Sequence, residues 1–423
     1  MTKQTPAIPE PPRGHLQSRR GFLAASTVAA GTIVSGRALA DSLADVPARE
    51  PGEDLSGLSE RSPFVHISRI PEAGPGQRNV DPSDAINSKA PLDKLVGSIT
   101  PADLHYERSH AGVPMLDPAR HRLLIHGMTR KQLVLTMDDI KAMPSMSRTV
   151  FIECTGNGWE NWHKADETLT VQNTHGLIST NEWTGVPLSF VLDLVGVDRD
   201  ALWMLAEGGD GAAVARSVPL TDEVIAEAML AYGQNGEPLR PAHGFPLRLV
   251  LPGFEGNMNI KWLRRLKFGD RPFMTRWETD RYTQLRPDGK AEQFHLHQDV
   301  NSVITAPSGM MSIRPGYNRI TGLAWSGHGK IMRVEVSTDG GATWQHAELN
   351  GPVLAKAQTR FQMDWSWDGK PTGIVSRSTD DKGNLQPDRK SFIARVGTTA
   401  LFHYNAQQTW RIAADGSVRN ALD

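Results

Sequence analysis

The sequence predicts an α+β protein in which a mixed region, from about 96 to 300, is followed by an all-β sandwich, from 301 to 423. Three observations lead to this fold class. The chain has 423 residues, which is too long for one compact core and indicates about two domains. Short strand-like and helix-like runs alternate in the first region. Period-two alternation with turn signals dominates the second region.

The first forty residues form a predicted export signal. The pair Arg19-Arg20 precedes a weakly apolar run over 22–34, and 38–40 is a small-x-small cleavage site of sequence Ala-Leu-Ala. Paired arginines before a weak apolar run are typical of the twin-arginine route. We therefore expect export to the periplasm and a mature chain that begins near Asp41. We expect no stable membrane anchor, because the apolar run is too short to span a bilayer.

The charge of the chain argues against a nucleic-acid partner. The formal net charge is −1, and the first forty residues carry five basic side chains and one acidic one, so the rest of the chain carries −5. An acidic surface does not attract phosphate backbones. The next segment, 41–95, is rich in Pro, Gly, Ser and charged residues and lacks periodicity, so we expect an irregular extension.

Local signals place the elements of the mixed region. Strand-like runs are rich in β-branched and aromatic residues, helix starts carry Thr with acidic residues behind it, and an Asn-Gly pair is a hairpin turn. The expected strands are 121–127, 148–154, 201–206 and 245–251, the expected helices start at Thr136, Gly185 and Thr221, and the expected turn is Asn235-Gly236.

The region from 301 onward shows the pattern of half-buried antiparallel strands. Met332, Val334 and Val336 alternate with Arg333 and Glu335, and an Asp-Gly-Gly turn follows. We expect the apolar members of this run to face a core and the charged members to face water. Strands at such spacing predict an immunoglobulin-like sandwich.

The only cysteine of the chain is Cys154, at the end of a predicted strand. Two glycines, Gly156 and Gly158, lie in the loop behind it and permit a close backbone approach. A thiolate at such a place is well suited to bind a soft or thiophilic metal. A buried structural cysteine explains the local motif equally well.

Several short motifs, taken in order, resemble the sulfite oxidase family of molybdopterin enzymes. The resemblance runs from about Pro101 to the end of the chain. The motifs that carry it are Cys-Thr-Gly-Asn at 154–157, His-Gly-Phe-Pro-Leu-Arg at 243–248, Lys-Trp-Leu at 261–263, Ala-Trp-Ser-Gly at 324–327 and Val-Glu-Val-Ser-Thr-Asp-Gly-Gly at 334–341.

The resemblance implies a molybdenum-molybdopterin cofactor, with Cys154 as the protein ligand of the metal. It also implies that Arg108 and Tyr282 line the substrate side, where they would orient the substrate and stabilise a developing oxyanion. Arg and Lys would satisfy the pterin phosphate by charge-assisted bonds. The residues that match cofactor-binding positions, besides Cys154, are Tyr106, Arg108, Ser109, His110, Asp210, His243, Arg248, Asn259 and Lys261.

Three of these residues also have a structural interpretation when each is taken alone. Arg248 has the residue type of a charged side chain on a surface strand, and His243 has that of a turn residue. Lys261 suits an edge side chain that lies along Trp262.

The sequence behind the cysteine loop departs from many sulfite oxidases, which have an Arg there. This chain reads Gly-Trp-Glu-Asn-Trp over 158–162. A free sulfite dianion needs paired cations when it is desolvated, whereas Trp159 and Trp162 suit a sulfur atom on a longer carrier. The variant is most similar to the sulfane dehydrogenase type, the molybdenum subunit of the bacterial thiosulfate-oxidising system. That type implies oxygen-atom transfer from water to sulfane sulfur; the alternative is a periplasmic sulfite dehydrogenase that acts on free sulfite.

The expected protein partners are inferred from the absence of a haem-attachment motif in the sequence and from the resemblance. The sequence has no Cys-x-x-Cys-His motif, so we expect a separate cytochrome c subunit as electron acceptor. The resemblance implies a sulfur-carrier protein as substrate donor and a homodimer, formed through the sandwich, within an α2β2 complex. Two other hypotheses stay open: a cofactor-free binding protein built on the sandwich, and a zinc site at His295 and His297.

Overall fold

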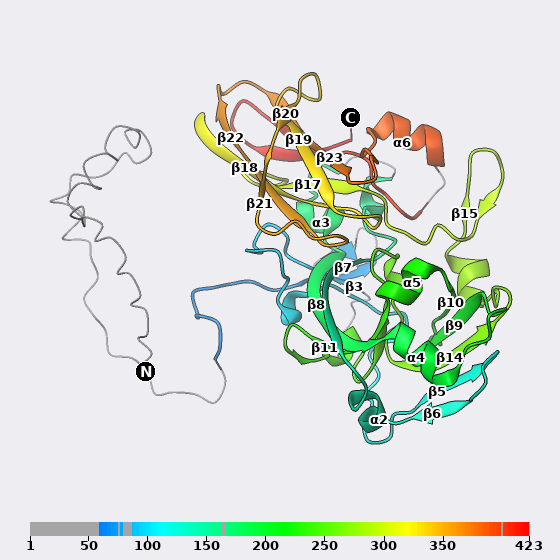
Figure 1. The fold of residues 1–423 in the computed structure, drawn as a ribbon. Coiled ribbons are helices and arrows are strands. Elements are labelled where there is room, and N and C mark those ends of the chain that lie inside the picture. The colour runs from blue at the N-terminus through cyan, green and yellow to red at the C-terminus, as the bar shows by residue number, and fades with distance from the viewer. Residues whose placement is uncertain (1–58, 75–76, 79–86, 163–165, 399–400, 423) are drawn as a thin grey trace, which may run out of the picture. The chain divides into compact units, whose positions relative to one another are not determined.

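The computed structural model describes residues 59–74, 77–78, 87–162, 166–398 and 401–422. The predicted export signal, 1–40, lies outside these ranges. The chain divides into two units, 1–65 and 66–423. In the first unit, the described residues contain a turn in which Val65 N donates to Ser62 O at 2.9 Å. The second unit contains every helix and strand described below (Figure 1).

Three sheets build the mixed region. The first is a small antiparallel sheet near its start, and the other two have five strands each, with one parallel pair, β14 and β5. The strand order in the first sheet is β2 (Gln77–Arg78), β1 (Ile70–Gly74), β3 (Asn87–Lys89) and β4 (Glu107–Arg108). The strand order in the second sheet is β10 (Ala215–Pro219), β9 (Trp203–Gly208), β14 (Leu263–Gly269), β5 (Leu123–Gly127) and β6 (Leu133–Leu135). The strand order in the third sheet is β12 (Glu237–Pro238), β11 (Met229–Gln234), β8 (Ile178–Pro187) and β7 (Met146–Glu153), and β13 (Arg248–Val250) also pairs with β11.

Short helices connect these strands, and capping fixes several of their starts. Thr136 accepts from Asp139 N while the Asp139 carboxylate accepts from Thr136 N, which completes a capping box. The α-helices are α2 (Met137–Lys141), α3 (Val171–His175), α4 (Leu188–Val195), α5 (Asp222–Glu227) and α6 (Arg389–Val396); the 3-10 turns are η1 (Ala102–Leu104), η2 (Trp159–Asn161), η3 (Pro241–His243) and η4 (Gly256–Met258); and a π-helical turn, η5, spans Trp277–Arg281.

Residues after 300 form two antiparallel sheets, which confirms a β-rich second part. These sheets are coloured yellow to red in Figure 1. A two-stranded hairpin, β15 (Gln284–Leu285) with β16 (Ala291–Glu292), precedes them. The strand order in the first of these sheets is β17 (Asn301–Ala306), β18 (Gly316–Trp325), β22 (Thr359–Trp367) and β21 (Glu348–Asn350). The strand order in the second is β20 (Gln345–His346), β19 (Ile331–Ser337), β23 (Thr372–Asp380), β24 (Thr409–Ile412) and β25 (Val418–Ala421).

The hydrophobic core crosses the expected boundary at residue 300. One cluster joins strands β7 and β8, for example through Phe151, to the inward faces of both late sheets, for example through Trp325 and Trp410. A second cluster fills the space between the sheets of the mixed region and helices α2, α4 and α5. The two parts of the second unit are therefore held together by shared apolar burial, which favours a fixed arrangement.

Some predicted elements differ from the observed ones for clear physical reasons. Residues 185–187 continue β8, because they pair with β11, so α4 starts later, at Leu188. The strand expected over 245–251 is confined to β13. Met332 is exposed and Ile331 is buried, because a bulge between Ile331 and Arg333 shifts the register.

Two further differences concern whole segments. The extension expected to be irregular over 41–95 contributes β1, β2 and β3, because their edges pair with each other and with β4. The all-β region contains one helix, α6, which starts at a side-chain cap on Asp388. Within the described ranges, no helix is both long enough and apolar enough to cross a membrane.

A close glycine contact between the two parts gives a stability test. Gly253 and Gly289 both have φ of 81°, but a Cβ on Gly253 would lie 2.1 Å from the Gly327 carbonyl oxygen, whereas a Cβ on Gly289 would meet nothing within 4 Å. We predict that Gly289→Ala costs about 1 kcal/mol of unfolding free energy through backbone strain. Gly253→Ala should cost about 1–3 kcal/mol more through overpacking. Urea denaturation of both variants measures this, and equal costs would contradict the tight contact.

Candidate active site

A cavity of about 700 Å³ lies where several loops of the mixed region meet. All the side chains that the sequence singled out for the cofactor and the substrate line it, so the structure brings them together. Their roles stay predictions. The lining residues are His105, Tyr106, Arg108, Ser109, His110, Ile152, Cys154, Asp210, Val214, Ala242, His243, Arg248, Gly256, Asn257, Asn259, Ile260, Lys261, Trp262 and Tyr282.

Cys154 directly follows strand β7 and is fixed by its backbone. Its N–H donates to Leu177 O at 2.9 Å, and its carbonyl accepts from Asn157 N at 2.9 Å. Gly256 lies so close that a Cβ there would be 3.1 Å from Cys154 Cα and 2.6 Å from Glu153 O. Burial raises the pKa of the Cys154 thiol, and the positive charge of Arg108 opposes that rise.

The opposite wall of the cavity is basic. Arg248 is buried and donates to His243 O at 2.8 Å and Asn259 O at 3.1 Å. Lys261 Nζ donates to Arg108 O at 3.1 Å and to Ser109 Oγ at 3.0 Å. Two cations are thus held near each other in a buried place, which is unfavourable unless an anion joins them.

The titration of these groups reflects that crowding. Burial, together with the charge of Arg248, lowers the pKa of Lys261 to about 7. Burial lowers the pKa of Arg248 to about 10. His105 is lowered to a pKa of about 3 by burial and by the same arginine, so its ring is neutral near pH 7. A bound anion would reverse the shift of Lys261, because it favours the charged form.

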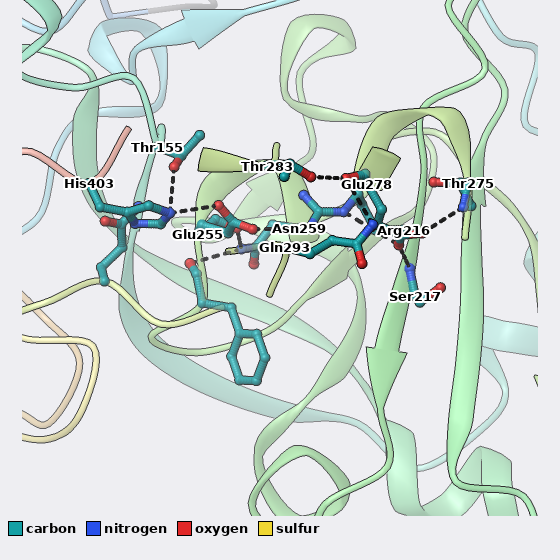
Figure 2. A network of polar contacts seen from close by, with 12 residues as sticks. Thr155, Arg216, Ser217, Glu255, Asn259, Thr275, Glu278, Thr283, Gln293 and His403 are labelled. Atoms are coloured by element: carbon teal, nitrogen blue, oxygen red, sulfur yellow. Dashed lines mark hydrogen bonds and ion pairs between the residues drawn. The ribbon is translucent and has the colours of Figure 1, made fainter. Parts of the chain in front are cut away.

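A buried network ties the cysteine loop to the Tyr282 side of the cavity (Figure 2). Thr155 Oγ1 lies 3.0 Å from His403 Nε2, and the same nitrogen lies 3.2 Å from Glu255 Oε2. Glu255 Oε1 accepts from Arg216 Nη2 at 3.1 Å, and Arg216 Nε lies 3.6 Å from Glu278 Oε1. Glu278 belongs to η5, so the network holds that turn in place.

Tyr282 follows η5 and closes the cavity. The guanidinium carbon of the fully buried Arg216 lies 5.0 Å from the centre of its ring. The Tyr282 hydroxyl lies 3.2 Å from His110 Nε2. Burial raises the pKa of Tyr282, and burial lowers that of His110 to about 3. The hydroxyl is therefore a proton-bearing donor near neutral pH.

A second cavity of about 750 Å³ shares the wall formed by Arg108, Cys154 and Tyr282 with the first. Trp159 and Phe402 give it aromatic surface. Its remaining lining residues are Glu72, Asn87, Lys89, Thr155, Gly156, Asn157, Gly158, Glu160, Asn173 and Leu177.

The expectation that Trp162 lies at the substrate site was wrong. This side chain is 2% exposed and packs against Phe392 and Tyr404, with ring centres 5.1 and 5.4 Å away. Trp162 stands at the end of η2, whose turn directs it into a small apolar cluster. Only Trp159 of the two tryptophans lines the second cavity.

The zinc hypothesis finds no support in the part of the chain that the structure describes. That part has no group of three or more His, Cys, Asp or Glu side chains able to hold a metal ion. His295 lies between Glu292 and Asp299, at 3.6 and 3.7 Å, whereas His297 lies 3.4 Å from Glu223. Between the two histidines the backbone takes a positive φ of 61°, so they do not share the face of a regular strand.

Three polar or aromatic lining residues, His105, Asn257 and Trp262, were not among the predicted site residues. His105 precedes Tyr106 and Trp262 follows Lys261, so a His or Trp directly beside a predicted site residue is a usable signal. Arg216 gave no signal, because an arginine within a strand is ordinarily a surface residue.

Comparison with known proteins gives this geometry a context. The model of the oxidoreductase molybdopterin binding domain matches residues 110–277, and that of the Mo-co oxidoreductase dimerisation domain matches 292–408. The crystal structure of the sulfane dehydrogenase SoxCD from Paracoccus pantotrophus is 40% identical, with a TM-score of 0.82, and the match covers 88% of this chain and 95% of that chain. The chain belongs to the sulfite oxidase family.

Other members of the sulfite oxidase family match over part of their length. Mitochondrial sulfite oxidase of Mus musculus is 34% identical over 332 residues, and NADH nitrate reductase 1 of Arabidopsis thaliana is 32% identical over 352 residues. These matches cover 71% and 72% of this chain, which spans 60% of the mouse protein and 38% of the plant protein.

Membership of the sulfite oxidase family implies a molybdenum-molybdopterin cofactor, and the cavity fits such a group. Among the described residues, His243 Nε2, Arg248 Nε and both amide atoms of Asn257 are buried without a hydrogen-bond partner. Buried polar atoms ordinarily have partners, so these atoms point to a polar ligand. A pterin with its phosphate would supply acceptors for the donors and an anion for the basic wall.

Lys261→Met tests the basic wall through cofactor retention. The variant loses the charge-assisted bonds to the cofactor's anion, each worth about 1.5–3 kcal/mol, so the pterin should bind about 10- to 100-fold more weakly. Pterin content after gel filtration, read by fluorescence of the oxidised pterin, measures this. Lys330→Met, at an exposed lysine, is the control. Equal pterin content in both variants would contradict the assignment.

Proposed function

We propose that this chain is the molybdenum subunit of a periplasmic oxidoreductase that oxidises sulfane sulfur on a carrier protein and passes the electrons to a cytochrome c. The 40% identity to sulfane dehydrogenase SoxCD, over most of both chains, supports this assignment. The sulfur gains one oxygen atom from water, and the reaction belongs to the oxidation of thiosulfate.

The charge balance of the second cavity is the observation that carries the proposal. Arg108 is the cation beside the cysteine. The other cation, Lys89, is paired with Glu72 at 3.1 Å and with Glu160 at 3.0 Å. A desolvated dianion such as sulfite needs more than one available positive charge. The cavity therefore suits a substrate of lower charge.

The aromatic surface of the same cavity supports a carrier-bound substrate. Trp159 and Phe402 line its wall, and such rings favour an apolar arm and a polarisable sulfur atom. An arm that enters this cavity reaches the wall that contains Cys154. A small hydrated anion gains little from this surface.

Each predicted residue has a part in the proposed reaction. Cys154 would hold the molybdenum through its thiolate, and the basic wall around Arg248 and Lys261 would hold the pterin phosphate. When bound, the molybdenum centre supplies oxygen-atom transfer and takes up two electrons. Arg108 and the Tyr282 hydroxyl would orient the sulfur and stabilise negative charge on the new oxygen.

A sulfite dehydrogenase that acts on free sulfite is the second candidate. Arg108 beside the cysteine favours it, because one cation already stands at the shared wall. The 34% identity to mitochondrial sulfite oxidase also agrees with it.

Location and partners complete the proposal. The Arg19-Arg20 signal predicts export by the twin-arginine route. The match of residues 292–408 to a dimerisation domain supports a homodimer, which we place in an α2β2 complex with the cytochrome subunit. The sequence has no c-type haem motif of its own.

Steady-state kinetics of the purified holoenzyme with its cytochrome decide between the two substrates. We predict that kcat/KM for sulfite is at least about 100-fold below that for a sulfane-loaded carrier protein, because the site is built for the latter. Rapid turnover of sulfite with none of the loaded carrier would favour the sulfite dehydrogenase instead.

Tyr282→Phe tests the substrate side. The variant removes the Tyr282 hydroxyl from the wall that both cavities share and should lower kcat by about 100-fold, the usual effect of losing one oxyanion donor. Tyr317→Phe, at an exposed tyrosine whose hydroxyl donates to Asp364 at 2.8 Å, is the matched control. A kcat equal to that of this control would remove Tyr282 from the mechanism.

A further inference from the structure

A buried cluster of three charged side chains lines the second cavity. Lys89 Nζ lies 3.1 Å from Glu72 Oε1 and 3.0 Å from Glu160 Oε1. The three side chains are 5%, 4% and 8% exposed, respectively. Lys89 also donates to the carbonyl of Asn173, in the middle of α3. The cluster thus contains two carboxyl groups and one ammonium in a place nearly closed to solvent.

The segment before β4 supplies two members of this cluster. Glu72 is on β1 and Lys89 is on β3, which pair as neighbours in the first sheet. The third member, Glu160, belongs to η2, directly behind the cysteine loop. A backbone bond from Ala90 N to Gly176 O, at 2.8 Å, fastens β3 to the end of α3. This arrangement therefore completes the wall of the substrate cavity.

The charge of the cluster favours the uptake of one proton. With both carboxyl groups ionised the cluster carries a net negative charge, which burial makes unfavourable. One proton shared by the two carboxyl groups makes the cluster neutral. Burial raises the pKa of Glu72 to about 7, against the opposing charge of Lys89.

The other titratable groups around the cavity leave this proton affinity in place. His175 stays neutral, since burial lowers its pKa to about 3. Arg108, Cys154 and Tyr282 line the far wall of the same cavity. Burial keeps the Tyr282 hydroxyl protonated and therefore uncharged. Among these three residues, Arg108 is the cation.

The proposed reaction needs a proton acceptor. When a sulfur atom gains an oxygen atom from one water molecule, one S–O bond forms, both O–H bonds of the water break, and two electrons go to the cytochrome. Two protons must then leave the cavity. General bases serve best when their pKa lies near the working pH.

We propose that the Glu72–Glu160 pair, held by Lys89, accepts one of the two protons released in the substrate cavity and passes it toward solvent. The second proton leaves with water. This role rests on the proposed function, because it requires that water is the source of the oxygen. Glu72, Lys89 and Glu160 line the same cavity as Arg108, Cys154 and Tyr282, so water molecules in this cavity would connect the pair to the shared wall.

Infrared spectroscopy of the resting holoprotein tests the shared proton without turnover. A carboxylic acid C=O band should be present at pH 6 and lost as the pH rises through about 7. Burial also raises the pKa of Glu153 to about 7, so this carboxyl group contributes a band of its own to both proteins. The band of the pair is therefore read from the difference between the wild-type and Glu72→Gln spectra. A difference spectrum without a titrating carboxyl band in this range would overturn the inference, even if the enzyme oxidises sulfane sulfur.

Steady-state kinetics test the role of the proton. In the wild-type enzyme, kcat should rise with pH through about 7, because the pair must be free of its proton to accept another. Glu72→Gln should lower kcat by about 100-fold and abolish this rise of kcat with pH. Lys89→Met should move the rise to higher pH, because loss of the ammonium disfavours the ionised carboxyl groups.

Glu237→Gln removes an exposed carboxylate paired with Arg240 and serves as the control. A Glu72→Gln enzyme with the kcat and pH profile of this control would overturn the inference. Failure of every sulfur substrate would refute the proposed function instead, while the infrared result would still report on the pair.

Discussion

The side chain of Asn157 fixes the geometry on which the site depends. Its amide nitrogen donates to Glu153 Oε1 at 2.8 Å and to His175 O at 3.1 Å, and its oxygen accepts from Leu177 N at 3.0 Å. Trp325, from the later sheets, donates to the other oxygen of the same carboxylate at 2.8 Å. The cysteine loop is thus fastened to β7, α3, β8 and β18 by one satisfied polar network, which is rigid because every alternative leaves a buried group unpaired.

The two cavities on either side of the cysteine have opposite electrostatic character, and this difference separates their tasks. The wall with Arg248 and Lys261 brings two basic side chains together, and burial lowers the pKa of both, so a bound anion would stabilise their charged forms. In the other cavity, Lys89 is already neutralised by its carboxyl partners. A phosphate-bearing cofactor therefore suits the first, and a substrate of low charge suits the second. Arg108 stands at the shared wall and serves both.

Much of the fold, and the set of predicted residues that line the first cavity, could be predicted because the signals are local. The capping box at Thr136 and the Asn235-Gly236 turn depend on residues that are neighbours in the sequence. The motifs of the basic wall are short, and they follow one another along the chain in the order that the resemblance implies. Long-range effects escaped prediction. Glu160 lies 71 positions from its partner Lys89, and the bulge that exposes Met332 depends on pairing with a distant strand. Such contacts follow from tertiary packing and leave no pattern in the sequence.

The sulfur ligation of molybdenum tests the account most directly. X-ray absorption at the molybdenum edge, recorded on the purified holoprotein and on Cys154→Ser, counts the sulfur neighbours of the metal. We predict one sulfur neighbour fewer in the variant, with pterin retained, because the basic wall is unchanged. The same number of sulfur neighbours in both proteins would contradict the assignment of Cys154 as the ligand and, with it, the role of both cavities.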